Sequence, residues 1–390
     1  MGLAACGPVL DKVRFGIVGV GGMGSGHARA MRDIEEVKLT AVCDVDRSTS
    51  ERVAAEHGVK GFTDYEDLVD SGLVDAIIVA TPHYFHPPVS IYAMKKKIHV
   101  LSEKPIAVTV KDADAMVAAA KASKVKFAVM YQTRSTPEYQ AARKLVEEGR
   151  LGKIYRTMCV DSGFRSQAYY DSAAWRGTWK GEGGGVLINQ APHKIDVFMS
   201  LGGLPSKVLA WTNTRRHKIE VEDEASALLS YKGGAVGYYH TSTTEFPNTE
   251  YLELCGENGK LVMYEDKVRF WALEKPLQEF SDTTPQMWDQ PKAREEVVEL
   301  EKRESGHAAI IRNLARSILY GEPLLSPGEE GLMSVEFINA TIMSGKLGKP
   351  VKIPVDRKAY SAFIEKMKRT SKPKRVKEAK RITDPRIGKA

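Results

Sequence analysis

Cysteine is scarce in this sequence, and no two cysteines lie close together. The four among 390 residues are Cys6, Cys43, Cys159 and Cys255. Without a Cys-x-x-Cys pair, neither a zinc site nor a redox-active dithiol is indicated, and reduced thiols in a cytoplasm are expected. Long apolar runs are also missing, since none approaches the roughly 18 residues that a membrane-spanning helix requires. We therefore expect a cytoplasmic protein with no membrane partner.

Excess positive charge is confined to the C-terminal end. Lys and Arg outnumber Asp and Glu by seven over the whole chain, but residues 357–390 alone hold thirteen basic and three acidic residues, so the remainder carries −3. This tail lacks the interleaved aromatic residues and the recognition motif of a nucleic-acid-binding segment. We expect no nucleic-acid partner, and we interpret 357–390 as a basic extension that is solvated or lies on a neighbouring subunit.

Residues 11–132 show alternating strand and helix patterns. Helical segments such as 111–123 separate short apolar runs at 13–18, 38–43, 75–80, 98–101 and 125–130. This alternation is typical of α/β proteins with a doubly wound parallel sheet and helices on both faces. We predict a Rossmann-like α/β domain over these residues.

The pattern changes after residue 132. Beyond a predicted helix at 137–149, amphipathic strands follow one another at 154–160, 207–214, 225–231, 235–243, 251–255 and 260–264, with one helix at about 184–201. Consecutive strands predict an α+β domain, residues 133–356, with a large, mostly antiparallel open sheet. Late helices at 307–319 and 327–347 and a strand at 350–354 complete it. The polar segment 274–302 is expected to be a surface loop.

A Gly-rich turn follows the first predicted strand. Gly19-Val20-Gly21-Gly22-Met23-Gly24 matches G-x-G-x-x-G between a buried strand and a helix, the context that supports dinucleotide binding. Gly19 permits the tight turn, Gly21 admits a pyrophosphate, and Gly24 allows helix and strand to pack closely. Amide groups at the helix start, including those of Gly22 and Met23, then face the phosphate charge. A Gly-rich turn without a nucleotide is the structural alternative.

The residue at the end of the second strand bears on the choice of cofactor. Asp44 stands 20 residues after Gly24, where a carboxylate accepts hydrogen bonds from the adenosine ribose and repels a 2′-phosphate. NAD is therefore favoured over NADP. Arg47 is close enough to pair with that phosphate, so NADP stays open as the less favoured cofactor.

Two further segments carry polar residues that suggest chemistry. Glu103-Lys104-Pro105 follows the strand at 98–101, and ligands bind at the carboxyl ends of strands in this architecture. In the glycine-rich segment 183–196, Asn189 and His193 are four residues apart and would share a helix face, with Asp196 nearby. A lone lysine is usually solvated and a lone histidine often belongs to a core, so neither segment decides the function alone.

Aromatic and arginine residues cluster just before these glycines. They are Arg165, Tyr169, Tyr170, Trp175, Arg176 and Trp179. Aromatic faces stack on the C–H surfaces of sugars and arginines donate to hydroxyls, which suggests a sugar site, although a core or interface group is an equal alternative. His83 and His86 lie among prolines with no carboxylate at ligand spacing, so no metal is expected.

The order of these motifs resembles the Gfo/Idh/MocA family, which includes glucose–fructose oxidoreductase and inositol dehydrogenase. The resemblance spans about residues 13–355 and includes Thr81-Pro82 with His86, Glu103-Lys104-Pro105 and the glycine-rich H-x-x-D segment. It implies a Rossmann domain joined to an α+β domain whose open sheet builds homodimers or homotetramers. We expect Thr81, Pro82, His86, Glu103, Lys104 and Gln132 to lie beside the cofactor.

The resemblance also implies roles for single residues. Lys104 resembles the lysine that contacts the reacting hydroxyl and the nicotinamide, and His193 resembles the general acid/base. Asn189 stands where many members carry Asp, and its amide can orient the substrate but cannot exchange a proton.

We predict hydride transfer between NAD and an alcohol carbon of a sugar, glycoside or inositol, with C3 of a glycoside as one candidate position. Arg165, Tyr169, Trp175, Arg176, Trp179, Asn189 and His193 are the predicted substrate contacts. An NAD-dependent, redox-neutral glycosidase and a non-catalytic protein that senses NAD or sugar remain alternatives.

Overall fold

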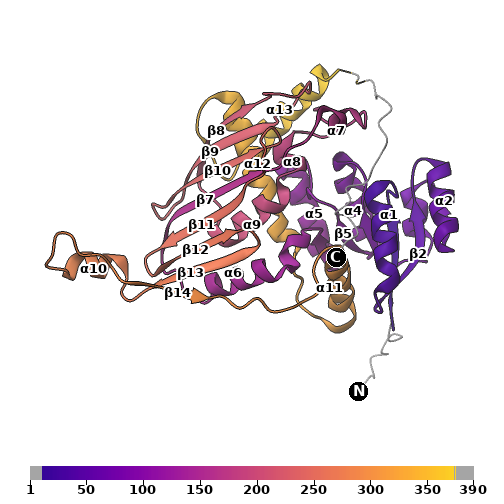
Figure 1. Cartoon of the computed structure of the whole chain (residues 1–390). Coiled ribbons are helices and arrows are strands. Elements are labelled where there is room, and N and C mark those ends of the chain that lie inside the picture. Colours follow the sequence, from indigo (N-terminus) through magenta and orange to yellow (C-terminus); the bar gives the residue numbers. More distant parts are fainter. Residues whose placement is uncertain (1–10, 373, 375–390) are drawn as a thin grey trace.

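Residues 11–372 and 374 are described by a computed structural model, and they build two sheets in separate parts of the molecule (Figure 1). The N-terminal sheet has six strands, all paired in parallel, in the order β3-β2-β1-β4-β5-β6. The second sheet has nine strands in the order β14-β13-β12-β11-β7-β10-β9-β8-β15, and its β7–β10 pair is parallel whereas the others are antiparallel. The predicted fold class is confirmed.

The parallel sheet follows the predicted alternation of strands and helices. Its strands are β1 (Val13–Val18), β2 (Val37–Cys43), β3 (Lys60–Phe62), β4 (Ala76–Val79), β5 (His99–Ser102) and β6 (Phe127–Val129). The helices between them are α1 (Gly22–Ala30), α2 (Arg47–His57), α3 (Tyr65–Asp70), α4 (His86–Lys95) and α5 (Val110–Ser123). Side chains of Asp46, Asp64 and Thr109 accept first-turn N–H groups and so fix where α2, α3 and α5 begin. Strand β3 was not predicted because three residues are too few to show a pattern.

Helix α11 (His307–Tyr320) packs on the parallel sheet, although it follows the second sheet in the chain. Its Ile311 and Leu314 share a buried core with Phe15 and Ile17 of β1. The sequence position of this helix predicts that it belongs to the second domain, but its buried face packs on the parallel sheet, so that prediction is wrong. An apolar stripe shows which helix face is buried, but not which sheet covers it.

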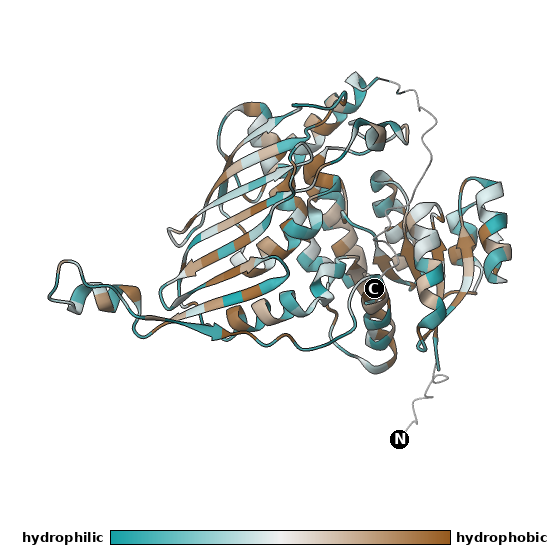
Figure 2. Ribbon diagram, viewed as in Figure 1, coloured by the Kyte–Doolittle hydropathy of each residue, from teal (hydrophilic) through white to brown (hydrophobic). Residues whose placement is uncertain are grey.

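The second sheet has helices on one face. Its strands are β7 (Ile154–Ser162), β8 (Lys207–Asn213), β9 (Glu224–Ser230), β10 (Val236–Ser242), β11 (Glu250–Gly256), β12 (Gly259–Tyr264), β13 (Lys267–Leu273), β14 (Ala293–Val297) and β15 (Val351–Lys352). The helices that cover it are α6 (Pro137–Glu147), α9 (Pro192–Gly202) and α12 (Gly328–Leu347). Phe198 of α9 and Phe337 of α12 pack on the ring of Tyr239 in β10. Hydrophobic and hydrophilic residues mix along the strands, as expected for a sheet with one packed face (Figure 2).

Two predicted elements differ in the structure. The single helix expected at 184–201 is divided into α8 (Val186–Asn189) and α9, because Pro192 cannot continue the hydrogen bonding of α8 and instead starts a new helix. The loop expected at 274–302 contains α10 (Leu277–Thr283) and the edge strand β14, on an arm that projects beyond the sheet (Figure 1). Strand β14 has mostly exposed charged residues, so no hydrophobic pattern marks it.

The C-terminal segment begins as a helix that packs on the body of the protein. Helix α13 (Arg357–Thr370) buries Tyr360 and Ile364, and Arg357 forms ion pairs with Asp114 and Glu336. The prediction of a solvated extension is therefore wrong for 357–370, which form an amphipathic helix whose other basic residues include the exposed Lys358, Lys366 and Arg369. Residues 375–390 lie outside the described part of the chain. Across the described residues, no helix combines the length and the apolar character needed to cross a bilayer.

Candidate active site

The glycine-rich turn combines packed positions with open ones. Gly19 has a φ of +88°, and a Cβ there would lie 2.7 Å from the carbonyl oxygen of Ala80. A Cβ on Gly24 would lie 1.9 Å from the carbonyl oxygen of Gly19, so both positions are restricted by the fold itself. A Cβ on Gly21 or Gly22 would meet nothing within 4 Å. Open space therefore lies above the turn, where free N–H groups at the start of α1 can meet an anion.

Asp44 is held at the edge of this turn. Its two carboxylate oxygens accept hydrogen bonds from the N–H groups of Val20 and Asp46, each at 3.0 Å. These bonds orient the carboxylate and leave further lone pairs to accept from a ligand. Arg47 begins α2, is largely exposed, and lies 3.8 Å from Glu51 of the same helix.

His86, a predicted cofactor contact, is enclosed by the protein. Both ring nitrogens lie 2.8 Å from main-chain carbonyl oxygens, Nε2 from that of Thr81 and Nδ1 from that of Pro105. The side chain is buried and joins the loops that follow β4 and β5. Its geometry is that of a positioning residue for the Thr81-Pro82 and Glu-Lys-Pro loops and not that of a cofactor contact.

Glu103 is buried and fixes the main chain of Lys104. Its carboxylate accepts a hydrogen bond from Nε2 of the buried His27 at 2.7 Å and one from the N–H of Lys104 at 3.1 Å. Burial is the largest single influence on Glu103 and opposes its ionisation, but the hydrogen bond and charge interaction with His27, with further contributions from His307 and Lys104, together outweigh burial and lower the pKa of Glu103 to about 2. An ionised carboxylate is thus fixed directly beneath the Lys104 main chain.

Lys104 connects the two segments that the sequence singled out. Its Nζ donates a hydrogen bond of 2.7 Å to the carbonyl oxygen of Asn189, at the end of α8. Burial lowers the pKa of Lys104, since a charged ammonium is less stable away from water.

His193 lies in the first turn of α9, close to Lys104 and Gln132. Its Nε2 accepts from the side-chain amide of Gln132 at 3.3 Å, and its Nδ1 has no partner among the described residues. Burial, together with the positive charge of Lys104, lowers the pKa of His193 well below 6.5. The imidazole is therefore neutral at pH 7 and able to accept a proton.

Asp196 does not form a catalytic stripe with Asn189 and His193. Its carboxylate accepts hydrogen bonds from Nε and Nη2 of Arg134 at 2.6 and 2.7 Å, and both side chains are fully buried. Arg134 belongs to the turn that carries Gln132, so this pair fastens α9 to that turn. The helix break at Pro192 is the reason that the expected shared face is absent.

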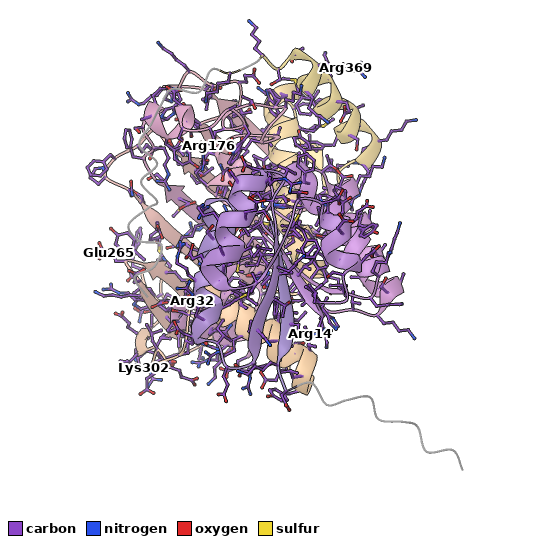
Figure 3. All side chains as sticks on the ribbon, turned by 90° about the vertical axis from the view of Figure 1, so that its right-hand side faces the viewer. Arg14, Arg32, Arg176, Glu265, Lys302 and Arg369 are labelled. Atoms are coloured by element: carbon purple, nitrogen blue, oxygen red, sulfur yellow. The ribbon has the colours of Figure 1, made fainter. Side chains whose placement is uncertain are left out.

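The predicted substrate residues divide into two groups. Trp179 is buried, its indole N–H donates to the carbonyl oxygen of Glu220, and its ring packs on Phe363, so the core alternative holds for this residue. Arg165, Tyr169, Trp175 and Arg176 lie together on the loop around α7 (Gln167–Asp171). In Figure 3, Arg176 lies in the upper part of the view, whereas Arg14, near the amino end of β1, lies in the lower part.

Tyr169 links that loop to Asn189. Its hydroxyl oxygen receives hydrogen bonds from Nη1 of Arg176, from Nε2 of Gln190 at 3.0 Å and from Nδ2 of Asn189 at 3.3 Å. The loop is therefore tied to the segment that meets Lys104. Gln190 was missed in the sequence, where nothing separates it from an ordinary polar residue.

Glu182 was missed as well. It is buried, and its carboxylate accepts hydrogen bonds from the Gly177 N–H and from Nδ2 of Asn189. Burial raises the pKa of Glu182 to about 7. Its position directly before three glycines was the available signal, because an acidic residue in a tightly packed turn needs a local partner.

Comparison with known proteins identifies the family of the chain. A model described as "Oxidoreductase family, NAD-binding Rossmann fold" matches residues 13–131, and the GFO/IDH/MocA C-terminal domain matches residues 139–262. The chain belongs to the Gfo/Idh/MocA oxidoreductase family. The resemblance inferred from the motifs is thereby confirmed.

Relatives within this family act on several kinds of molecule, by their names. The 2,7-anhydro-N-acetylneuraminate hydratase of Escherichia coli K12 is 34% identical over 197 residues, which cover 50% of this chain and 51% of that protein. The chain thus spans about half the length of that relative. Myo-inositol 2-dehydrogenase of Thermotoga maritima is 24% identical over 335 residues, covering 83% of this chain and 93% of its own.

A solved relative shares the fold over nearly the whole chain. The WlbA dehydrogenase of Bordetella pertussis, in complex with NADH and UDP-GlcNAcA, superposes with a TM-score of 0.74 at 28% identity. The superposition covers 88% of this chain and all of WlbA.

Proposed function

We propose that this protein is an NAD-dependent dehydrogenase that oxidises a secondary alcohol of a sugar, glycoside or inositol. The observation that carries the proposal is the hydrogen bond from Lys104 to Asn189, because it brings the Glu-Lys-Pro loop against the segment that leads to His193. The names of inositol and sugar dehydrogenases among the relatives support the same reaction class and do not favour a redox-neutral glycosidase or a sensing protein.

The residues around the glycine-rich turn suit NAD. The open space above Gly21 and Gly22 leaves room for a pyrophosphate, and the oriented carboxylate of Asp44 suits ribose hydroxyls. Bound there, NAD would supply the hydride acceptor for the alcohol carbon.

Two residues of the chain act on the hydroxyl group of the substrate: Lys104 on its oxygen and His193 on its proton. Lys104 is placed to donate a hydrogen bond to the alcohol oxygen, which stabilises negative charge as it develops. Neutral His193 accepts the hydroxyl proton at Nε2, the atom that Gln132 contacts in the structure. The side-chain amide of Asn189 is neither an acid nor a base near pH 7, and Asp196 is paired with Arg134, so His193 is the base that this segment offers.

The proposal extends to assembly and location. The helix-free face of the second sheet exposes large apolar side chains, among them Tyr155, Trp211 and Leu228, which supports a homodimer or homotetramer built on that face. Light scattering of the purified protein tests the assembly.

The proposed location is the cytoplasm. The described cysteines are free and buried, in keeping with a cytoplasmic protein.

Purified protein should be incubated with NAD and a panel of sugars, glycosides and inositols while the absorbance of reduced nicotinamide is followed. Accumulation of NADH with a panel member is the expected result. Release of aglycone without NADH would instead indicate the glycosidase, and tight NAD binding with no turnover would indicate a sensing protein.

A further inference from the structure

Three cations around the proposed site lack an anionic partner in the described chain. Among residues 11–372 and 374, no carboxylate oxygen lies within 4.0 Å of the side-chain nitrogens of Lys104, Arg165 or Arg176. Neighbouring cations differ in this respect, since Lys194 pairs with Glu250 at 2.6 Å. Outside its C-terminal tail the chain is net negative, so an overall excess of basic residues does not explain the cluster.

The arrangement of Arg176 shows a surplus of hydrogen-bond donors. Its guanidinium lies 4.3 Å from the ring centre of Tyr169 and 4.5 Å from that of Trp175, which fixes its plane. Nη1 donates to the Tyr169 hydroxyl, which also takes two amide donors, while the buried Nε has no partner among the described residues. Donors that are buried without acceptors cost stability unless a ligand satisfies them.

Arg165 lies near the same tyrosine and, like Arg176, has no ion-pair partner among the described residues. Its guanidinium carbon lies 5.7 Å from the Tyr169 ring centre. Its hydrogen bonds go to main-chain carbonyl oxygens, at 2.9 Å on Phe164 and 3.4 Å on Gly163. Neutral carbonyl groups do not compensate a full positive charge.

The nearby carboxylates are engaged elsewhere. Glu182 accepts from the Gly177 N–H and from Asn189, and Asp171 accepts from the side chain of Gln167. Glu182 is near enough for the charge of Arg176 to lower its pKa against the effect of burial, but neither carboxylate is within ion-pair distance of Arg165 or Arg176 in the described chain, so no direct ion pair neutralises either guanidinium.

We infer that the substrate is an anionic sugar whose carboxylate or phosphate group is bound by Arg176 and Arg165. The inference rests on the proposed function, since it names the substrate class of the same site. Guanidinium groups match the planar geometry of carboxylates and the oxygens of phosphates with paired N–H donors. Tyr169 contacts both arginines and also Asn189, whose carbonyl oxygen accepts the hydrogen bond from Lys104. An anion bound by the two arginines would therefore place the rest of the sugar toward His193.

The test compares matched substrates. Methyl glucoside, methyl glucuronide, glucose, glucuronate and glucose 6-phosphate are assayed with NAD on the wild-type protein. We expect kcat/KM to be at least about tenfold higher for the glucuronates or for the phosphate than for the neutral partner. Which of the two anions is preferred identifies the source of the charge. A KM that rises with ionic strength for the anionic substrate alone is also expected.

Variants assign the preference to the arginines. Arg176→Gln and Arg165→Gln should each lower the anionic-to-neutral ratio of kcat/KM by about tenfold. Among the described residues, the Arg165 side chain donates only to the carbonyl oxygens of Gly163 and Phe164 beside it, so its variant keeps the test valid even if Arg176→Gln is unstable. Arg143→Gln, which removes an arginine on α6 that pairs with Glu147, is the matched control and should leave the ratio unchanged.

Equal or better turnover of the neutral sugars, or an unchanged ratio in both variants, would overturn the inference and leave the proposed function intact. If neither this panel nor the wider panel of sugars, glycosides and inositols produced NADH although NAD bound, the proposed function itself would fail. The two failures are therefore distinguishable in one assay.

Discussion

The ammonium group of Lys104 donates a hydrogen bond to the main-chain carbonyl oxygen of Asn189, 2.7 Å away. This contact joins the loop after β5 of the parallel sheet to the end of α8, one short turn before His193. The positive charge of Lys104 also acts on His193, whose pKa it helps to lower. Lys104 is thus placed by two structural units together, and neither unit alone brings it near the imidazole.

Lys104→Ala should reduce kcat by about 100-fold to 1,000-fold, because a preorganised donor to the developing alkoxide is lost. NAD affinity, measured by calorimetric titration, should change little, since the predicted phosphate and ribose contacts lie at Gly19–Gly24 and Asp44. Lys111→Ala, on the exposed start of α5, is the matched control. An unchanged kcat in Lys104→Ala would remove this residue from the mechanism.

The pH dependence of alcohol oxidation should reflect the lowered pKa of His193. The neutral imidazole is the base, and its fraction falls only when the pH drops below its pKa, which burial and Lys104 hold well below 6.5. We therefore expect kcat/KM not to fall through loss of this base between pH 8 and 6.5. His193→Ala should lower kcat by about 100-fold to 10,000-fold.

Glu182 provides the control for that profile. Its carboxyl group, with a pKa raised to about 7, is another group in the site that titrates near neutrality. An inflection near pH 7 that disappears in Glu182→Gln belongs to Glu182. If the prediction holds, kcat/KM in Glu182→Gln either does not fall at acidic pH or falls only well below pH 6.5. A fall in kcat/KM with its midpoint at or above pH 6.5 in this variant would contradict the prediction for His193.

The sequence was most informative where backbone geometry demands a residue type. Gly19 and Gly24 are required by contacts of 2.7 and 1.9 Å that any Cβ would make, so the motif identifies both the turn and the fold around it. Apolar runs likewise predict β1 and β4, which are almost wholly buried. Both kinds of signal can be recognised in a short stretch of sequence, even where the contact that requires the residue, such as that of Gly19 with Ala80, is distant along the chain.

Long-range pairing was not predictable in the same way. Trp179 and Trp175 look alike in the sequence, yet Trp179 lies in the core against Phe363, from a helix that had been interpreted as an extension. Asp196 resembles a site residue by its spacing from His193, and only the folded chain shows its partner to be Arg134. Partners distant along the chain carry no local signal.

The glycines of the turn separate folding from ligand binding. Gly24→Ala should lower the free energy of unfolding by about 1–3 kcal/mol or more, because its methyl group meets the Gly19 carbonyl oxygen.

Gly21→Ala adds a methyl group that meets no protein atom within 4 Å, so this variant should melt like the wild type. Its affinity for NAD should fall about tenfold or more, because the methyl group stands where a pyrophosphate must approach. Gly26→Ala, also in open space on α1, is the control for both measurements. Normal NAD affinity in Gly21→Ala would argue against a pyrophosphate at this turn.

Asp44→Ser should shift the choice of cofactor. Losing a charged acceptor weakens NAD by roughly tenfold to a hundredfold, while removing the negative charge improves NADP relative to NAD. Titrations of both coenzymes on the variant, on the wild type and on Asp33→Asn, which removes an exposed charge after α1, measure this ratio. A wild-type preference for NADP would contradict the role assigned to Asp44.

The buried pair of Arg134 and Asp196 should dominate the stability of the junction around His193. Asp196→Asn leaves the guanidinium buried without its bidentate partner, and we expect the free energy of unfolding to fall by about 3–5 kcal/mol. The double variant Arg134→Met with Asp196→Leu removes both fully buried charges and should recover part of that loss, because the other carboxylate that Arg134 contacts, Glu330, is partly exposed and can be solvated. Denaturant unfolding of the single, double and Glu329→Gln proteins measures the difference, with the last removing only an exposed carboxylate on α12. A single variant as stable as the wild type would show that the pair does not anchor α9, and the position of His193 would then need another support.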